Sequence, residues 1–454
     1  MKTAAIITEY NPFHNGHAYQ LSEVQKRSDA DFLIILMSGD FVQRGTPALF
    51  DKFVRTETAL LCGADLVLEL PLAFATGSAQ RFAEGAVSIL NGLEIVDELW
   101  FGSEEGALET FTLLADILKE EPEKYQDLLK EHLKKGLSYP AARSAALGEY
   151  CSRPDLLSKT MDSDSFRSNA TDADSHSREA VQNPVYIEEF LKKPNNILGL
   201  EYVLALKKLN SSIRPRTLQR TGSGYHAEQL EGVFSSATAI RREIAEKGFS
   251  GVQESIKTAV PEQCFSLYKE NASKNRFVLE NQVSEALRYQ LWKESPDSLC
   301  SYLDISQELA NRIINLRPEF RSFTQFAELL QTRNQTRTAL QRALLHILLG
   351  ITWEDAEISV PSQPMGKSGI SPVPLSSGQR LIRMLGLSLS ARKGGLLSGI
   401  PKDGPIAITA NPGTHPLSGQ YEKELFASQY YESLISRNSG EAFIPEYSRK
   451  LVLK

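Results

Sequence analysis

The chain has few cysteines, no excess of positive charge and no long apolar run. Its 454 residues contain four cysteines, none of them spaced as Cys-x-x-Cys: Cys62, Cys151, Cys264 and Cys300. This usage argues against a disulfide framework and suits a reducing compartment, so we expect a cytoplasmic protein. The formal net charge is −6, so the chain as a whole does not attract polyanions, and any nucleic-acid surface must be local.

Long apolar stretches are also missing. The N-terminal run within MKTAAIITEYNPF is too short for a signal peptide, and the other apolar runs are strand-sized or amphipathic. We therefore expect no membrane span and no membrane partner. The length allows two or three domains.

Residues 1 to about 110 alternate between predicted strands and helices. Apolar runs at 3–8, 32–39, 65–71 and 95–102 read as strands, and 51–62 and 79–91 read as helices. Short, nearly all-apolar strands separated by helices indicate an α/β fold with a parallel sheet covered on both faces. Ligands of such sheets bind at the carboxyl ends of strands, which places three segments along one edge: His14 to His17, Gly39-Asp40 and Gly102-Ser103.

The most informative segment is Thr8-Glu9-Tyr10-Asn11-Pro12-Phe13-His14-Asn15-Gly16-His17, between the first strand and the first helix. A glycine turn that opens a helix offers unpaired N–H groups and the positive end of the helix dipole, which together favour an anion such as phosphate. Two imidazoles three residues apart add donors for charge that develops on a phosphate. A metal site or two ordinary surface histidines are the alternatives, but no third Cys or His lies nearby, so we predict no metal site.

Later segments offer further phosphate contacts. Asn195 or Asn196 can cap a helix that continues to 209, and a predicted strand at 213–221 ends at Arg220. Ser236 begins a helix that carries Arg241 in its first turns, a combination of hydroxyl, free N–H groups and guanidinium that suits a phosphate. An ordinary serine cap with surface arginines explains the same residues.

The rest of the chain is predicted as a series of regions. A polar Ser- and Asp-rich insertion occupies 151–190, a helical region follows at 261–353, and a linker with a small C-terminal region covers 354–454. His346 lies in an apolar helix and is predicted to pack rather than to react. The segment 306–346 carries an excess of arginines, which is typical either of a solvated helix face or of an RNA contact surface: Arg312, Arg317, Arg321, Arg333, Arg337 and Arg342.

These motifs resemble a known family. His14-Asn15-Gly16-His17 is similar to the HxGH motif of the nucleotidyltransferase superfamily, and the segment from Ser236 to Arg241 is similar to its second motif. Several blocks more narrowly resemble the bacterial tRNA(Met) cytidine acetate ligase family: TEYNPFHNGH, SGDFVQRG, FGSE, PNNILGLEY, RTGSGYH and ALLHILLGIT. The resemblance implies a Rossmann-like nucleotidyltransferase domain at 1–260, which contains the insertion, followed by a mainly helical tRNA-binding region at 261–353.

The resemblance also implies a reaction. ATP and acetate would form acetyladenylate, and the acetyl group would pass to the wobble cytidine of elongator tRNA(Met) to give N4-acetylcytidine. His14 and His17 would be catalytic, with Ser236 and Arg241 as candidates for pyrophosphate, Asp40 and Gln43 for acetate or cytidine, and Arg333, Arg337 and Arg342 for tRNA. ATP contacts would fall on Ile7, Thr8, Glu9, Tyr10, Asn11, Pro12, Phe13, His14, Asn15, Gly16, His17, Ala18, Tyr19, Gln20, Gly102, Asn195 and Arg220.

Two other functions fit parts of the pattern. A small-molecule adenylyltransferase would use the same HxGH chemistry without needing the helical basic region. A non-catalytic RNA-binding protein would not need the intact His14, Gly16 and His17. The sequence implies no stable protein partner, and it does not reveal a Mg²⁺ requirement, the oligomeric state or the basis of tRNA selection.

Overall fold

The computed structural model describes residues 1–156, 182–220, 236–356 and 379–454. Their contacts divide the chain into two compact units, residues 1–97 with 222–454 and residues 98–221. This division by contact differs from the predicted consecutive domains, whose functional boundaries stay a prediction. The middle of the predicted insertion, the RTGSGYH turn after Arg220 and most of the predicted linker lie outside the described residues.

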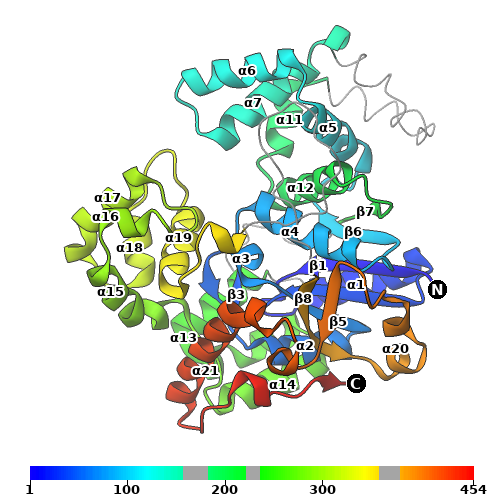
Figure 1. Ribbon diagram of the computed structural model, residues 1–454, viewed down its shortest axis with the longest axis vertical. Helices are drawn as coiled ribbons and strands as arrows, with labels where there is room; N and C mark the ends of the chain where they lie inside the picture. Colours follow the sequence, from blue (N-terminus) through cyan, green and yellow to red (C-terminus); the bar gives the residue numbers. More distant parts are fainter. Residues whose placement is uncertain (157–181, 221–235, 357–378) are drawn as a thin grey trace. The chain divides into compact units, whose positions relative to one another are not determined.

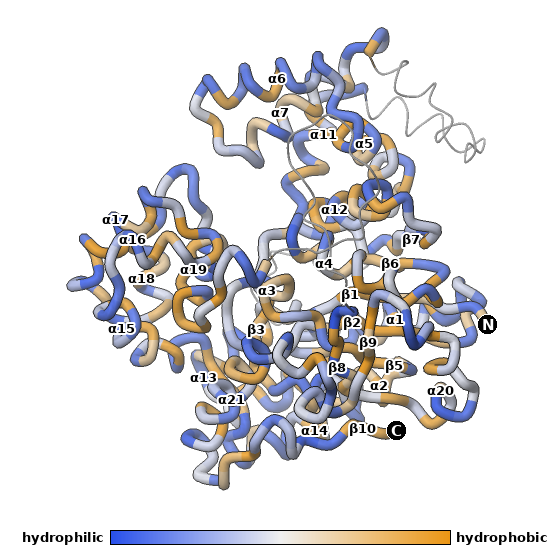
Figure 2. The backbone as a smooth tube through the Cα atoms, viewed as in Figure 1, coloured by the Kyte–Doolittle hydropathy of each residue, from blue (hydrophilic) through white to orange (hydrophobic). Residues whose placement is uncertain are grey.

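The first unit is built on a mostly parallel sheet. Strand β1 (Thr3–Thr8) pairs in parallel with β2 (Phe32–Ser38), and β2 pairs in parallel with β5 (Leu66–Leu70). The strands are almost wholly apolar and almost wholly buried, as expected when helices cover both faces. Figure 2 shows the strands of this sheet largely in the orange of apolar residues. The predicted parallel α/β architecture is confirmed.

The C-terminal region also contributes to this sheet. Strand β8 (Arg380–Leu387) runs antiparallel to β5, while β9 (Ile406–Thr409) and β10 (Val452–Leu453) pair in parallel with β8. Sequence analysis did not predict β8. The reason is Arg383, a charged residue inside the strand that is nevertheless buried.

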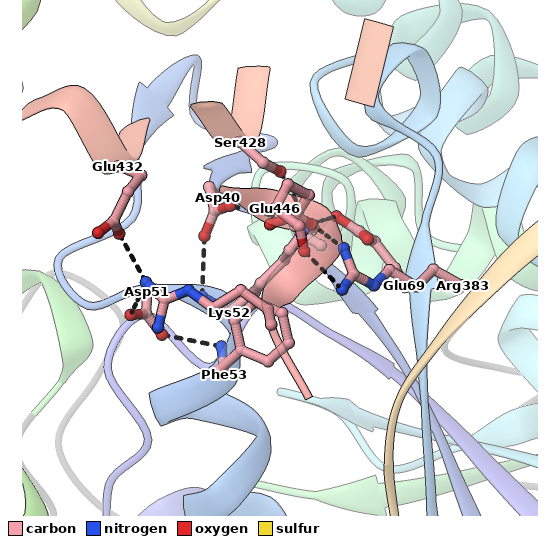
Figure 3. A network of polar contacts seen from close by, with 12 residues as sticks. Asp40, Asp51, Lys52, Phe53, Glu69, Arg383, Ser428, Glu432 and Glu446 are labelled. Atoms are coloured by element: carbon pink, nitrogen blue, oxygen red, sulfur yellow. Dashed lines mark hydrogen bonds and ion pairs between the residues drawn. The ribbon is translucent and has the colours of Figure 1, made fainter. Parts of the chain in front are cut away.

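Arg383 is buried because it belongs to a cluster of charges, which we call the lysine cluster: Asp40, Lys52, Glu69, Arg383 and Glu446 (Figure 3). The ammonium of Lys52 lies 2.7 Å from a Glu69 carboxylate oxygen and 2.5 Å from one of Glu446. Arg383 pairs with the same Glu446 oxygen. Buried charges require such partners, and these join strands from both ends of the chain.

Helices cover the sheet of the first unit and form a separate helical group (Figure 1). Those nearest the N-terminus are α1 (Asn15–Ser28), α2 (Lys52–Leu61), α3 (Leu72–Ala75) and α4 (Ala79–Gly92). The later ones are α13 (Ala237–Ala259), α14 (Glu262–Ser273), α15 (Ser284–Lys293), α16 (Pro296–Leu299), α17 (Gln307–Leu316), α18 (Phe323–Leu329), α19 (Arg337–Leu349), α20 (Leu389–Lys393) and α21 (Glu422–Ser439). A short hairpin of β3 (Phe41–Val42) and β4 (Thr46–Pro47) follows β2.

The helical group α15–α19 shares one apolar core with α3 and α21. Leu287, Ile313, Phe326 and Leu344 come from four of its helices, and Tyr431 comes from α21. His346 is fully buried there, with Nδ1 3.0 Å from the Leu303 carbonyl oxygen and Nε2 3.1 Å from that of Thr76. The prediction that His346 packs is confirmed.

The second unit pairs β6 (Glu98–Ser103) in parallel with β7 (Arg214–Gln219). Its helices are α5 (Leu108–Glu120), α6 (Glu123–Lys134), α7 (Tyr139–Cys151), α11 (Pro184–Phe190) and α12 (Pro194–Lys208). Helix α11 lies within the predicted insertion, yet Ile187 and Phe190 are buried, so the end of that segment is part of the folded unit.

The remaining expectations concern membranes and thiols. In the part of the chain that the structure describes, no helix combines the length and apolarity needed to cross a bilayer. All four cysteines are free thiols, as their scattered spacing predicted.

Candidate active site

The two predicted catalytic histidines stand together where α1 begins. His14 is the N-cap, and its Nδ1 accepts a hydrogen bond from the Gly16 N–H at 3.0 Å. The Nδ1 of His17 accepts from the His14 N–H at 3.3 Å, and the two rings stack with centroids 3.8 Å apart. Because each Nδ1 acts as an acceptor, each neutral ring carries its proton on Nε2. Both imidazoles are thereby oriented as Nε2 donors at a helix N-terminus.

Gly16 is required by this arrangement for a steric reason. A Cβ atom added at Gly16 would lie 2.9 Å from His14 Cε1 and 3.1 Å from His14 Nδ1. Any larger residue would therefore displace the His14 ring or break its bond to the Gly16 N–H. The glycine of the motif therefore leaves room for the His14 ring and also allows the turn.

The loop that precedes α1 is held by side chains from distant elements. Its carbonyl groups accept from three of them: Arg55 Nη1 donates to Glu9 at 2.7 Å, Arg241 Nη1 to Asn11 at 2.5 Å, and Tyr268 Oη to Phe13 at 3.2 Å. These contacts fix the backbone ahead of the histidines, so the site needs little rearrangement.

Arg55 is the most consequential residue that sequence analysis missed. It is fully buried on α2, and it also donates to the carbonyls of Ser38, Gly39 and Phe50. It therefore ties the end of β1 to the end of β2. An arginine among the apolar residues of a helix was the available signal, but its partners are 5 to 46 positions away in sequence.

The predicted ATP-binding segment from Ile7 to Gln20 divides into buried and half-exposed parts. Tyr10, Asn11 and Phe13 are at most 2% exposed, and the rings of Tyr10 and Phe13 pack with centroids 4.7 Å apart. Their side chains belong to the core, which leaves their backbone for any ligand. The side chains from Asn15 to Gln20 are half-buried and follow the start of α1.

The second predicted motif lies beside the first. Ser236 caps α13 by accepting from the Ala239 N–H at 3.1 Å, and Arg241, one turn further on, reaches the Asn11 carbonyl. Burial and the nearby guanidinium of Arg44 lower the pKa of Arg241 to about 10. Two guanidinium groups that repel each other near two helix N-termini are stabilised by an anion of high charge. Arg44 is a second residue that sequence analysis did not single out.

Asp40 and Gln43, the candidates for acetate or cytidine, have partners of their own. The Asp40 carboxylate accepts from the Lys52 N–H at 2.8 Å within the lysine cluster, and it is 6% exposed. Burial raises the pKa of Asp40 to about 6, opposed by the positive charge of Lys52. The Gln43 N–H donates to the Glu9 carboxylate at 2.6 Å, which ties the β3–β4 hairpin to the end of β1. Contact of either residue with a substrate stays a prediction.

The second unit brings together the other three predicted ATP contacts. Gly102 lies at the end of β6, opposite Leu218 of β7, and the Arg220 N–H donates to the Ser103 carbonyl at 2.9 Å. Asn195 Nδ2 donates to a Glu104 carboxylate oxygen at 2.7 Å, just beyond the same strand. Within this unit the three residues share one edge of the β6–β7 pair. Their contact with ATP stays a prediction.

The predicted tRNA residues have different surroundings. Arg337 pairs with Glu328 at 3.0 Å, and Arg333 is exposed. Arg342 is half-buried, and burial lowers its pKa while the carboxylate of Asp304 raises it. Within the described ranges, no group of three or more His, Cys, Asp or Glu side chains could hold a metal ion.

Comparisons with a family model, with related sequences and with solved structures all point to one family. Residues 1–441 match the HIGH nucleotidyl transferase family. A tRNA(Met) cytidine acetate ligase of Acetivibrio thermocellus is 38% identical over 359 residues, 79% of each chain, and one of Thermoanaerobacter sp. is 35% identical over 446 residues, 97% of each chain.

Solved structures agree with the sequence matches. The crystal structure of Thermotoga maritima TmcAL bound with alpha-thio ATP matches with a TM-score of 0.80 and 30% identity, over 100% of this chain and 99% of that one. The paired histidines, the second motif beside them and these similarities lead to one conclusion. The chain belongs to the tRNA(Met) cytidine acetate ligase family of HIGH nucleotidyl transferases.

Proposed function

We propose that this protein uses ATP to join acetate to the wobble cytidine of elongator tRNA(Met), giving N4-acetylcytidine. The observation that carries the proposal is the pair of imidazoles at the start of α1, with both Nδ1 atoms bound by backbone N–H groups. That arrangement orients donors toward a phosphate, which is what activation of acetate by ATP requires.

In the first step a carboxylate oxygen of acetate attacks the α-phosphorus of ATP. The bond from that phosphorus to the bridging oxygen breaks, and pyrophosphate leaves with its electron pair. The Nε2–H groups of His14 and His17 stabilise the charge that builds on the α-phosphate oxygens. The N-terminus of α13, capped by Ser236, and Arg241 receive the pyrophosphate. Gly102, Asn195 and Arg220 are proposed as further ATP contacts from the family resemblance.

In the second step the exocyclic amine of cytidine attacks the acetyl carbon of acetyladenylate. The carbon–oxygen bond of the mixed anhydride breaks, AMP leaves, and the amine loses a proton. No covalent enzyme intermediate is needed. Arg333, Arg337 and Arg342 are the proposed tRNA contacts, and Asp40 and Gln43 are the proposed contacts for acetate or cytidine. Cytoplasmic location and action without a stable protein partner stay predictions.

The direct test incubates the purified protein with ATP, labelled acetate and elongator tRNA(Met), with other tRNAs in parallel. We expect labelled elongator tRNA(Met), AMP and pyrophosphate. Transfer of AMP to a small metabolite with the tRNA unlabelled would instead identify a small-molecule adenylyltransferase.

A variant tests the role of the histidines. His17→Ala should lower acetate-dependent exchange of pyrophosphate into ATP by about 100- to 1,000-fold, because one donor to the α-phosphate is lost. Its affinity for tRNA should stay near that of the wild type. Normal acetylation by His17→Ala would show that the assigned chemistry is wrong.

A further inference from the structure

Two aromatic side chains of α15 are unusually exposed. Tyr289 is 68% exposed and Trp292 is 55% exposed, while Leu287 and Leu291 on the same helix are buried. Residues three apart lie on the same side of a helix, so both rings stand on one side of α15. In Figure 1, α15 belongs to the lime-coloured helices of the helical group. We call Tyr289 and Trp292, with the cations beside them, the aromatic ridge.

Each ring carries a cation. The guanidinium of Arg317 lies 4.6 Å from the centroid of the Trp292 ring, and the ammonium of Lys293 lies 5.4 Å from that of Tyr289. Arg317 Nη1 also donates to the carbonyls of Leu291 and Glu294, at 3.0 Å each. These bonds hold the guanidinium against the Trp292 ring, so this part of the surface is ordered before any partner arrives.

Two more arginines extend the positive charge. Arg288 lies over the Phe320 ring at 5.4 Å and donates to the carbonyls of Phe320 and Arg321. Arg321 is exposed. In the described part of the chain, no carboxylate forms an ion pair with Arg288, Lys293, Arg317 or Arg321.

Other arginines of the helical group differ in this respect. Arg312 pairs with Glu308 at 2.6 Å, and Arg337, one of the proposed tRNA contacts, pairs with Glu328 at 3.0 Å, so a phosphate would have to displace a carboxylate from each of them. The Glu294 carboxylate near the ridge is bound by Tyr302 Oη at 2.7 Å and by Gln290. Arg317 and Lys293, the cations that lie against the two exposed rings, therefore have no carboxylate ion-pair partner among the described residues.

We propose that the aromatic ridge stacks unpaired nucleobases of the tRNA substrate, with its cations bound to the adjoining phosphates; this inference rests on the proposed function. Bases offer flat π faces to Trp and Tyr, and the RNA backbone supplies the negative charge that the cations lack. An apolar protein surface would match the rings but would leave the cations without partners.

Substitution of the rings tests the ridge. Trp292→Ala and Tyr289→Ala should each weaken binding of tRNA(Met) by about tenfold, as expected for the loss of one stacked base. Phe426→Ala is the matched control, because Phe426 is 52% exposed on α21, away from the ridge in sequence. It should bind tRNA like the wild type. Lys293→Gln should lower the slope of log affinity against log salt by about 0.7 to 0.9.

Fluorescence gives a readout that does not depend on activity. The chain has three tryptophans, and Trp100 is only 6% exposed. In a Trp353→Phe background, tRNA should quench the emission of Trp292, and the quenching should disappear in the double variant with Trp292→Ala. Unchanged emission on saturation with tRNA would overturn the proposal.

The failures of the two proposals can be separated. Acetate-dependent exchange of pyrophosphate into ATP without tRNA should be unchanged in Trp292→Ala and Tyr289→Ala, because the ridge takes no part in adenylation. Absence of exchange in the wild type would refute the proposed function. Normal exchange together with unaltered tRNA affinity in both variants would refute the ridge alone. A changed oligomeric mass of Trp292→Ala with unaltered tRNA affinity would identify a protein-docking surface and also overturn it.

Discussion

The lysine cluster allows a quantitative test of how ion pairs between the N-terminal and C-terminal parts of the chain stabilise the fold (Figure 3). Lys52 is 0% exposed, and its ammonium meets Glu69 at 2.7 Å and Glu446 at 2.5 Å, with Asp40 at 3.9 Å. Arg383 is the second cation. Three carboxylates thus face two cations. Burial raises the pKa of Asp40, the positive charge of Lys52 opposes that rise, and the nearby Glu446 carboxylate adds to it.

Lys52→Met removes one of these two cations without changing the side-chain length greatly. Two buried carboxylates are then left in excess, and breaking a buried pair in this way costs about 3–5 kcal/mol. With a slope of about 3 kcal/mol per molar urea, the midpoint of unfolding should fall by about 1 to 1.7 M. The assay is urea denaturation followed by circular dichroism at neutral pH.

Two further variants make the test specific. Lys26→Met is the matched control, since Lys26 has a 68% exposed side chain paired with Glu23, and it should change the midpoint little. Glu69→Gln leaves two cations with two carboxylates, so it should cost less than Lys52→Met and should recover part of the loss when combined with it. If Lys52→Met unfolds at the wild-type midpoint, or if the double variant recovers nothing, the charge balance does not stabilise this fold.

Three further predictions concern the residues around the histidines. The pKa of Asp40 is about 6 in the folded state and 3.8 as the ordinary value, so the folded state binds more protons and stability falls as pH rises between them. In urea titrations at several pH values, Asp40→Asn should reduce this loss of unfolding free energy by about 3 kcal/mol. If the free energy of unfolding of the variant depends on pH as that of the wild type does, the raised pKa of Asp40 is contradicted. Gly16→Ala should lower acetate-dependent pyrophosphate exchange at least about tenfold at unchanged unfolding midpoint, because the new methyl group displaces His14. Gly419→Ala, with no atom within 4 Å of the new Cβ, is its control, and equal activity of the two variants would refute the steric argument. Arg55→Met should lower the free energy of unfolding in urea by about 3 kcal/mol or more, because the carbonyls at the ends of β1 and β2 lose a buried charged donor. It should also reduce acetate-dependent pyrophosphate exchange. A variant as stable as the wild type would exclude that role.

Local patterns were enough for the nucleotide-binding half of the fold. The predicted strands at 3–8, 32–39 and 65–71 match β1, β2 and β5 closely, because buried parallel strands are continuous apolar runs. The prediction missed β8, since a charged residue at Arg383 interrupts that pattern. Its burial is compensated by Glu446, 63 residues further along the chain, which no local window can show.

The sequence by itself determined the family and the position of the histidine motif. His14, Gly16 and His17 adjoin a strand and a helix, so spacing alone placed them at a helix N-terminus, where anions bind. Only the tertiary structure decided how that site is held and which arginines keep an unneutralised charge. Arg55, Arg241 and Tyr268 contact the same loop from three different helices. Arg317, at the end of α17, lies against the Trp292 ring of α15. The reason is physical: the partners of a buried or stacked cation are fixed by packing between distant segments, while the start of a helix is fixed by its neighbours in sequence.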